Sequence, residues 1–409
     1  MSEPAPGSWV PDAAGSGFDL DHLPYGVVTV AGGPPRCGVR IGPWVLDVAS
    51  AATAAPTPYA EPARLLGGAT LDPFLAAGPP AWDRVRAWLH EVLADPTART
   101  WVRPHLHPVA EVAPRLAFTV ADYVDFYASE HHATNVGRIF RPGSEPLHPS
   151  WRHLPIGYHG RAGTVVVSGA DVVRPRGLRR EPEGAGPTFG PTRRLDLEAE
   201  LGLVVGVGST HGVPVPVREA PQHLFGVVGL NDWSARDVQA FETVPLGPFL
   251  GKSFATSVSA WVTPLAALDA AWVDLPGQDP PPAPHLAVDG PAGLAIDVEV
   301  EVAGQVVARP PYASMYWSPW QMLAHLTSNG ASLRTGDLLG SGTISGPGRE
   351  QRGSLLELSW GGTEDVVVGS GTRRFLEDGD EVVLRYAAPS TSGGRLTLGE
   401  VRGRVLPAR

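Results

Sequence analysis

Residues 195–208 read LDLEAELGLVVGVG, and this stretch decides the fold class of the chain. Its first half alternates apolar and acidic residues with a period of two, which predicts a β-strand, and its second half is a continuous apolar run. Asp196, Glu198 and Glu200 fall on one face of the predicted strand. Neighbouring carboxylates repel one another, so their charge needs compensation. A bound cation is one source of this compensating charge, and nearby Arg193 and Arg194 are another. In the alternative interpretation the segment is a solvated edge strand and forms no binding site.

The composition agrees with a β-rich protein that has many turns. The 409 residues include 49 glycines and 43 prolines, and long uninterrupted helices are therefore not expected. With 43% hydrophobic residues and 12 tryptophans, the chain has enough apolar material for a large core and is not disordered. The length suggests two domains.

Charge and cysteine content exclude several classes of partner. The formal net charge is −10, whereas a general nucleic-acid binder needs a basic face. Cys37 is the single cysteine, which excludes intramolecular disulfides and thiolate metal clusters. The apolar runs LGLVVGVG and HLFGVVGL are too short to cross a membrane, and MSEPAPGSWV lacks the pattern of a secretory signal. We expect a soluble cytoplasmic protein that binds neither nucleic acid nor membrane.

The order of patterns along the chain predicts two domains, residues 1–115 and 116–409. Residues 26–48 indicate a small antiparallel module, and 80–94 form an amphipathic pattern with Trp82, Val85, Trp88, Leu89 and Val92 at helical spacing. After the boundary we expect helices over 120–136 and from about 232. We expect strands around 163–168, 196–208, 258–263 and 295–308, a strand series over 355–405, and loops at 179–194 and 275–285.

Polar residues line up in the segment ADYVDFYASEHHATNVGRIFR at 121–141. If the segment is helical, Asp125, Ser129 and His132 lie at i, i+4 and i+7 and form one stripe. A carboxylate and an imidazole then share a face. A solvated helix face is the alternative interpretation.

A second polar group occurs in GLNDWSARDVQAFE at 229–242, where Asn231 or Asp232 is a candidate helix cap. Asp232, Arg236 and Gln239 then recur at i, i+4 and i+7, although Asp232 and Arg236 also fit a simple surface ion pair. The loop TVPLGPFLGKSFATS follows, with Lys252 as its lone cation. This lysine either reaches to solvent or is held in a site.

Four carboxylates, Asp125, Glu198, Glu200 and Asp232, offer hard oxygen ligands without a cysteine or a histidine pair beside them. Such a set favours Mg²⁺ or Ca²⁺ over zinc or copper. The residue types do not distinguish between the two ions.

Six segments together resemble the fumarylacetoacetase family in order and spacing: DYVDFYASEHHATNVG, HLPIGYHGRAGTVVVSG, LDLEAELG, LNDWSARDVQ, VPLGPFLGKSF and GDLLGSGTISGPG. The resemblance implies a mainly β fold with α (α+β), in which a small N-terminal SH3-like barrel precedes a larger β-rich catalytic domain of the mixed β-sandwich roll type. It also implies a homodimer and metal-dependent hydrolysis of the carbon–carbon bond of a diketo acid, 4-fumarylacetoacetate. That reaction is the last step of tyrosine and phenylalanine degradation.

The resemblance also implies roles for individual residues. It makes His132 the general base, Glu357 the acid that orients it, and Arg236, Gln239 and Lys252 the groups that stabilise an oxyanion. The implied metal ligands are Asp125, Glu198, Glu200 and Asp232, with Lys252 and Thr256 at a second cation. The implied substrate-binding residues are Tyr127, Arg141, Gln239, Thr243 and Thr343. Thr243 stands where the family commonly has Tyr.

Other functions fit the same residues less well. Relatives with the same kind of catalytic domain hydrolyse acylpyruvates or decarboxylate their substrates. A carbohydrate-active protein is disfavoured because Glu198 and Glu200 share one strand face, whereas the acids of a glycosidase flank the sugar bond. A non-catalytic β-rich binding module is the remaining alternative. The motif GxSxG does not occur, so an acyl-enzyme route of the α/β-hydrolase kind has no support.

Overall fold

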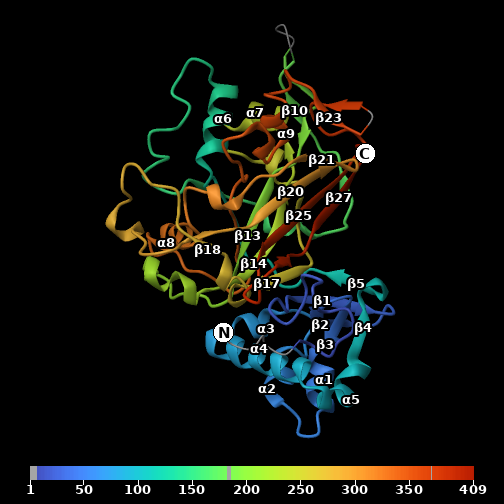
Figure 1. Ribbon diagram of the computed structural model, residues 1–409. Helices are drawn as coiled ribbons and strands as arrows, with labels where there is room; N and C mark the ends of the chain where they lie inside the picture. The colour runs from blue at the N-terminus through green and yellow to red at the C-terminus, as the bar shows by residue number, and fades with distance from the viewer. Residues whose placement is uncertain (1–6, 182–185, 370) are drawn as a thin grey trace.

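The computed structural model describes residues 7–181, 186–369 and 371–409 and has a smaller N-terminal and a larger C-terminal part (Figure 1). The larger part is built mostly from sheet, and the smaller part combines a sheet with several helices, which confirms the predicted α+β class. Residues 1–6 of the N-terminal segment and residues 182–185 of the predicted loop at 179–194 lie outside the described residues.

The N-terminal part begins with the antiparallel module predicted at 26–48. Strands β1 (Tyr25–Val30), β2 (Pro35–Ile41) and β3 (Trp44–Asp47) pair in sequence order. The predicted amphipathic helix is α4 (Pro79–Ala94), which buries Val85, Trp88, Leu89 and Val92. The other elements of this part are α1 (Val48–Ala54), α2 (Ala60–Leu65), α3 (Asp72–Leu75), α5 (Arg99–Val102), β4 (Leu106–Pro108) and β5 (Val112–Arg115).

The two parts share one sheet. Strand β1 pairs with β2 and β5, and it also pairs with β17 (Trp261–Pro264) through the residue pairs Tyr25↔Val262 and Gly26↔Trp261. Backbone hydrogen bonds between β1 and β17 therefore connect the residues before position 115 with those after it. The division into two domains at that position stays a prediction.

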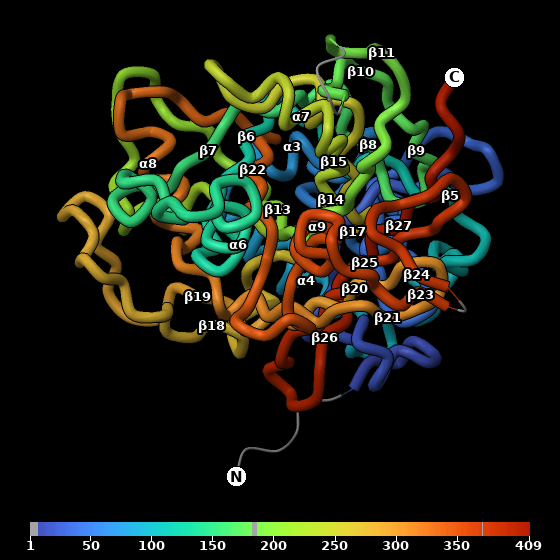
Figure 2. The backbone as a smooth tube through the Cα atoms, turned by 90° about the horizontal axis from the view of Figure 1, so that it is seen from above, coloured from blue at the N-terminus to red at the C-terminus, as the bar shows by residue number. Residues whose placement is uncertain are grey.

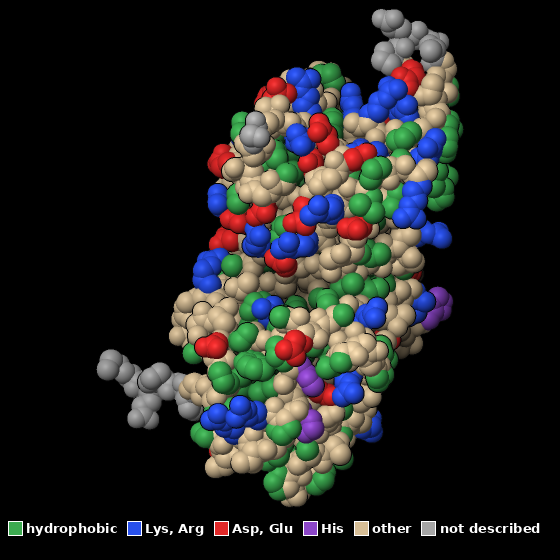
Figure 3. All heavy atoms as spheres, turned by 90° about the vertical axis from the view of Figure 1, so that its right-hand side faces the viewer, with side chains coloured by type: hydrophobic (Ala, Val, Ile, Leu, Met, Phe, Trp, Pro, Cys, Tyr) green, Lys and Arg blue, Asp and Glu red, His purple; other side chains and the backbone are tan. Residues whose placement is uncertain are grey.

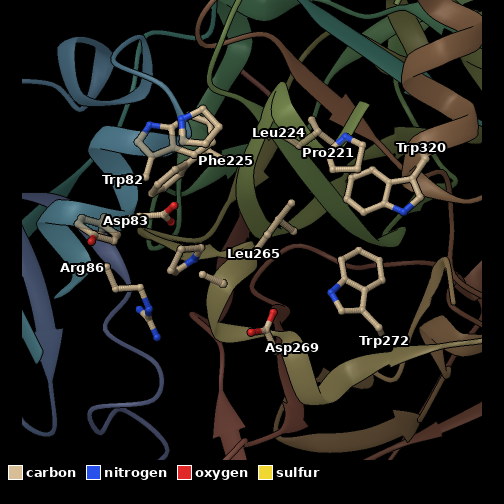
Figure 4. A pocket seen from close by; sticks show the side chains of 14 residues that line it. Trp82, Asp83, Arg86, Pro221, Leu224, Phe225, Leu265, Asp269, Trp272 and Trp320 are labelled. Atoms are coloured by element: carbon tan, nitrogen blue, oxygen red, sulfur yellow. The ribbon is translucent and has the colours of Figure 1, made fainter. Parts of the chain in front are cut away.

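Aromatic side chains fill much of the seam between the parts, as Figure 4 shows around Trp82 and Phe225. The Phe225 ring, on β14 (Leu224–Asp232), lies 5.1 Å from that of Trp82 and 5.4 Å from that of Phe74. Beside them is a cavity of about 260 Å³, whose far wall carries the stacked indoles of Trp272 and Trp320. Contacts of this kind make the apolar core continuous between the parts.

The alternating acidic stretch at 195–208 lies at the centre of the larger sheet. Strand β13 (Ala199–Val205) is hydrogen-bonded to β14 (Leu224–Asp232) on one side and to β22 (Leu338–Gly340) on the other. Its residues are buried on both faces, so the solvated-edge interpretation is wrong. Further strands of this sheet are β6 (Tyr123–Phe126), β7 (Gly157–His159), β8 (Val165–Val167) and β16 (Thr256–Val258); Figure 2 shows β6, β7 and β22 grouped on one side of β13.

A second sheet packs against the first. Its long strand β25 (Glu381–Pro389) presents Tyr386 to β14 at Gly229, where an added Cβ would lie 2.3 Å from the tyrosine ring. Only glycine allows that approach. The other strands are β20 (Asp297–Val302), β21 (Gln305–Ala308), β26 (Arg395–Thr397), β27 (Val401–Leu406) and β9 (Val172–Val173).

Two predicted helices are wrong in part. Residues 123–126 form strand β6, which pairs with β22, and the helix α6 (Glu130–Phe140) begins only after Ser129. Asp232 ends strand β14, so neither it nor Asn231 caps a helix; α7 (Arg236–Glu242) starts later, behind Ala235. Strand β6 and the end of β14 each lie between two other strands and are buried on both faces. Such segments lack the alternation of apolar and polar residues by which a strand is identified from sequence.

The strand series predicted from residue 355 is wrong at its start, where Leu355–Leu358 form the one-turn helix α9. The segment 275–285 is a loop, as predicted, up to a helical turn at Pro284–Leu286. The remaining elements are β10 (Arg176–Arg179), β11 (Thr188–Pro191), β12 (Leu195–Asp196), β15 (Ser234–Ala235), β18 (Trp272–Val273), β19 (Gly293–Leu294), α8 (Pro319–Thr327), β23 (Val366–Val368) and β24 (Gly371–Arg373).

Charged side chains of both signs are interspersed over the face shown in Figure 3. On the outer strands Arg385 pairs with Glu299 and Glu301, and Arg402 pairs with Glu381. Among the helices that the structure describes, none combines the length and the apolar character needed to cross a membrane.

Candidate active site

A histidine and a glutamate meet where α6 and α9 approach each other. His132 Nδ1 lies 2.7 Å from Glu357 Oε2, and both side chains are buried. Each helix begins with a serine cap three residues earlier: Ser129 Oγ accepts from the His132 N–H, and Ser354 Oγ accepts from the Glu357 N–H. The caps fix where each helix starts and therefore where each side chain points.

Glu357 is held as a carboxylate. Asn135 donates to its Oε1 at 2.9 Å, and the hydroxyls of Ser345 and Ser354 each donate to Oε2 at 2.9 Å. Burial by itself raises the pKa of this group, but His132 and the hydrogen bonds outweigh burial and lower the pKa to about 2. An ionised Glu357 keeps a proton on His132 Nδ1 and leaves Nε2 free to accept one.

On the other side of His132, two cations enclose Glu198. Arg236 Nη2 donates to Glu198 Oε1 at 2.7 Å, and the Lys252 ammonium contacts Glu198 Oε2. His132 Nε2 lies 3.7 Å from Glu198 Oε1. Lys252 also lies 2.6 Å from Asp232 Oδ2, and burial lowers its pKa to about 8. The charge of Glu198 is therefore compensated from within the protein, and by different groups than Arg193 and Arg194.

Three other carboxylates converge beside Glu198, and among the described residues only Lys252, at Asp232, pairs with any of them. Asp125, Glu200 and Asp232 each place one oxygen within 4.8 Å of the other two, and all three are buried. They come from three strands of the central sheet: β6, β13 and β14. Burial, together with the charge of Asp125, raises the pKa of Glu200 and of Asp232 well above the usual range. A set of three such groups is electrostatically incomplete.

A divalent cation fits this set. Asp125 Oδ1 and Glu200 Oε1 are buried and have no hydrogen-bonding partner among the described residues. Gly340 lies beside them on β22, where an added Cβ would be 2.9 Å from Asp125 Oδ1 and 3.0 Å from Glu200 Oε2. The donors are carboxylate oxygens, the ligands that Mg²⁺ and Ca²⁺ prefer. Glu198 lies beside this set, and its oxygens face Arg236 and Lys252 instead.

One cavity of about 390 Å³ opens onto both groups. The predicted site residues that line it are Asp125, Tyr127, His132, Glu198, Glu200, Arg236, Gln239, Thr243, Lys252 and Thr343. Its outer wall is apolar and includes Val136, Phe140, Ile156 and Leu246. A cavity of this size holds a small molecule with a polar and an apolar end.

Four predicted residues lie outside the cavity lining. Glu357 is connected to it through His132. Asp232 and Thr256 are buried behind it, where Thr256 Oγ1 donates to Asp232 Oδ1 at 3.2 Å. Arg141 is exposed and donates to the backbone oxygen of Pro146. At the rim, Thr243 Oγ1 donates to the Gln239 backbone oxygen at 2.6 Å, so its hydroxyl is occupied by its own helix.

Sequence reasoning missed several residues that hold this site together. The Tyr158 hydroxyl donates to Asp232 Oδ2 at 3.1 Å, and Asn135 supports Glu357. Asp196 shares a predicted strand face with Glu198 and Glu200, but it accepts from Arg236 Nε at 2.8 Å and is not part of the carboxylate set. Tyr158 lies in the segment HLPIGYHGRAG, one of the six that carry the family resemblance, and its position there is the signal that could have identified it.

Comparison with protein families gives two matches that cover nearly the whole chain. The family described as Fumarylacetoacetase N-terminal matches residues 21–117, and Fumarylacetoacetate (FAA) hydrolase C-terminal matches residues 122–406. A fumarylacetoacetase from Oryza sativa subsp. japonica is 42% identical over 418 residues, covering 98% of this chain and 97% of the relative. A fumarylacetoacetase from Homo sapiens is 43% identical over 415 residues, covering 98% and 99%.

Among solved structures, a fumarylacetoacetate hydrolase from Exiguobacterium antarcticum superposes with a TM-score of 0.55. The alignment covers 95% of this chain and 100% of that structure, at 16% sequence identity. This likeness supports the fold of the chain.

Proposed function

The chain belongs to the fumarylacetoacetate hydrolase family, and from that premise we propose that it hydrolyses 4-fumarylacetoacetate to fumarate and acetoacetate. The reaction completes the breakdown of the tyrosine and phenylalanine ring. The observation that carries the proposal is the shared cavity, which is lined both by His132 of the buried His–Glu pair and by Asp125 and Glu200 of the converging carboxylates.

A bound Mg²⁺ or Ca²⁺ is part of this proposal. Asp125, Glu200 and Asp232 would hold it, and we propose Glu198, which shares the Lys252 ammonium with Asp232, as a fourth ligand. Such an ion would supply a Lewis acid for a substrate that carries ketone groups. Lys252 and Thr256 both contact Asp232, which is consistent with the predicted second cation lying near that residue.

His132 is proposed as the general base. Its Nε2 faces the cavity side while Glu357 retains the proton on Nδ1, so Nε2 accepts a proton from water. The water oxygen then bonds to the ketone carbon next to the double bond. The bond between this carbon and the neighbouring CH₂ breaks, and its electron pair remains on the departing CH₂ carbon. That carbon takes up the proton that His132 received from water, which gives acetoacetate and restores the base.

Arg236, Gln239 and Lys252 are proposed to stabilise the negative charge that develops on the attacked ketone oxygen. The Arg236 side chain is fixed from three sides, by Asp196, Glu198 and Gln239. Donors fixed in advance need no reorganisation as charge develops, and this makes them effective in a buried site.

Four residues that line the cavity are proposed to contact substrate: Tyr127, Gln239, Thr243 and Thr343. Thr343 Oγ1 is buried and lacks a hydrogen-bonding partner in the described part of the chain. Arg141 is also proposed, at the outer end of α6. Arg141 Nη2 donates a hydrogen bond to the backbone oxygen of Pro146. To reach a substrate carboxylate in the cavity, the side chain has to leave this contact and turn inward.

A cytoplasmic homodimer completes the proposal. Val244, Leu246, Phe249 and Leu250 expose large apolar side chains next to the cavity rim, and an exposed cluster of this kind is typical of an interaction surface. Cys37 is buried and unpaired, which suits a reducing compartment. Light scattering on the purified protein tests the dimer.

The decisive test follows the loss of 4-fumarylacetoacetate with the purified protein, before and after treatment with a chelator. We expect hydrolysis that chelation abolishes and that Mg²⁺ or Ca²⁺ restores. Formation of fumarate and acetoacetate in equal amounts identifies the bond that is cleaved. If the protein leaves 4-fumarylacetoacetate intact but hydrolyses acylpyruvates, the substrate assignment is wrong and Thr243 is the first residue to examine.

A further inference from the structure

Asp196 occupies a central place between the two halves of the site. It ends the short strand β12, has no exposed surface, and its carboxylate accepts four hydrogen bonds. Oδ2 accepts from Arg236 Nε at 2.8 Å and from the Leu356 N–H at 3.0 Å. Oδ1 accepts from the N–H groups of Leu197 and Leu355, each at 2.8 Å.

We infer that Asp196 is a positioning residue that sets Arg236 and the Glu357–His132 pair in register with each other. The inference rests on the proposed function, because it assigns Asp196 a role in that reaction. Asp196 lines no part of the cavity and acts only through the groups that it holds.

The first connection runs to Arg236. Asp196 accepts from Nε, Glu198 accepts from Nη2, and Gln239 accepts from Nη1 at 3.3 Å. Nε lies nearest the backbone, so its bond to Asp196 sets the plane in which the guanidinium group points to Glu198 and Gln239. Without that bond the remaining contacts allow the side chain to rotate, and the planar guanidinium group loses its fixed orientation.

The second connection runs to α9. The N–H groups of Leu355 and Leu356 are the first two of this helix, and they have no carbonyl partner within it. Asp196 accepts from both, and Ser354 accepts from the third, that of Glu357. Asp196 therefore orients the turn from which Glu357 reaches His132.

Only a carboxylate serves both connections. All four partners of Asp196 are donors, so an asparagine would direct its own NH₂ group at two of them. Either the Arg236 contact or the α9 contact would then fail. Misplacement of catalytic groups by about 1 Å costs on the order of 10²-fold in rate, and we expect a loss of that size in kcat.

The test is Asp196→Asn, measured by kcat and KM for 4-fumarylacetoacetate and by thermal unfolding. Asp380→Asn is the matched control, because Asp380 is also buried, lies outside the cavity lining, and accepts from the Arg373 side chain and from the backbone N–H of Glu377. We expect Asp196→Asn to lower kcat about 10²-fold with little change in KM. Asp380→Asn should lower the melting temperature and leave kcat unchanged.

Double mutants separate a positioning role from a merely structural one. In an Arg236→Lys or a Glu357→Gln background, Asp196→Asn should cost less than about tenfold in kcat, because the group through which it acts is already impaired. Full additivity in both backgrounds, or a kcat equal to wild type in the single variant, would overturn the inference. If Asp196→Asn does not fold cooperatively, Asp196→Glu replaces it under the same criteria. Absence of turnover by the wild-type protein would instead contradict the proposed function.

Discussion

His132 Nδ1 and Glu357 Oε2 lie 2.7 Å apart although 225 positions separate the two residues in the sequence. Serine caps place both residues in the first turn of a helix, and the carboxylate receives three further hydrogen bonds from Asn135, Ser345 and Ser354. The pair is therefore held in one geometry before any ligand arrives. This arrangement connects the fold of the larger C-terminal part with the proton transfer that we propose.

Replacing His132 with alanine should remove the general base and lower kcat by at least about 10²-fold. Binding of Mg²⁺ or Ca²⁺, measured by calorimetry, should stay within about twofold of wild type, since the three converging carboxylates are unchanged. Glu357→Gln should lower kcat too, because a neutral amide stabilises the protonated imidazole less. Glu377→Gln, at an exposed position, is the control and should keep full activity. A His132→Ala protein with wild-type kcat would show that the base is another residue.

Neutralising one of the converging carboxylates should stabilise the metal-free protein. At neutral pH the repulsion among Asp125, Glu200 and Asp232 opposes folding, because the raised pKa of Glu200 disfavours its charged form. This penalty applies above pH 4.5, the usual pKa of a glutamate, because the unfolded chain is charged there. Each unit by which folding raises the pKa of Glu200 corresponds to about 1.4 kcal/mol. Glu200→Gln should therefore raise the free energy of unfolding in chelator, measured by denaturant titration.

The same variant should lose the benefit of added metal. Mg²⁺ should raise the melting temperature of the wild-type protein, as any ligand that binds only the folded state does. It should raise that of Glu200→Gln much less, since one of the three oxygen ligands has become a neutral amide. A Glu200→Gln protein that is less stable in chelator and responds fully to Mg²⁺ would contradict a cation site at these residues.

Gly340 should be needed for the carboxylate set to keep its spacing. A methyl group at this position would stand 2.9 Å from Asp125 Oδ1 and 3.0 Å from Glu200 Oε2, which is closer than unbonded carbon and oxygen atoms approach. Gly340→Ala should therefore weaken Mg²⁺ binding by about tenfold or more in a calorimetric titration. Gly163→Ala, at a position with nothing within 4 Å of the added methyl, should leave the affinity unchanged.

His22 should make stability depend on pH below neutrality. The ring is fully buried between Gly17 and Thr263, and burial lowers its pKa from 6.5 to about 3. Between these values the unfolded chain binds a proton that the folded protein does not. Stability is therefore complete above pH 6.5 and declines as pH falls toward 3, by up to about 1.4 kcal/mol per pH unit.

Denaturant unfolding of His22→Gln between pH 7 and pH 4 measures this contribution. The variant should be less stable than wild type at pH 7, where it loses the fitted ring, and the difference should shrink as the pH falls. His211→Gln, at an exposed position, should follow the wild-type curve in parallel. Parallel curves for His22→Gln and wild type would mean that His22 is protonated in the folded protein.

Secondary structure was predicted well where one face of an element is exposed and poorly where both are buried. Helix α4 has a polar face and was predicted almost to the residue. Strand β6 and the end of β14 carry Asp125 and Asp232 inside a sheet that is covered on both sides, and the residue pattern wrongly predicted helix for both. Glu357 was assigned from family resemblance, but the segment that carries it is a helical turn and not a strand.

The sequence by itself determined the β-rich class, the kind of metal that the donors suit and the identity of the charged residues in the site. Residue type and local order are sufficient for these, since carboxylates keep their chemistry in any fold. Only the tertiary structure decided which carboxylates stand together. Asp196, Glu198 and Glu200 alternate along one segment, yet Asp196 holds Arg236 and α9, Glu198 faces two cations, and Glu200 joins Asp125 and Asp232. Those assignments depend on partners far away in the chain, and it is packing between strands that brings them together.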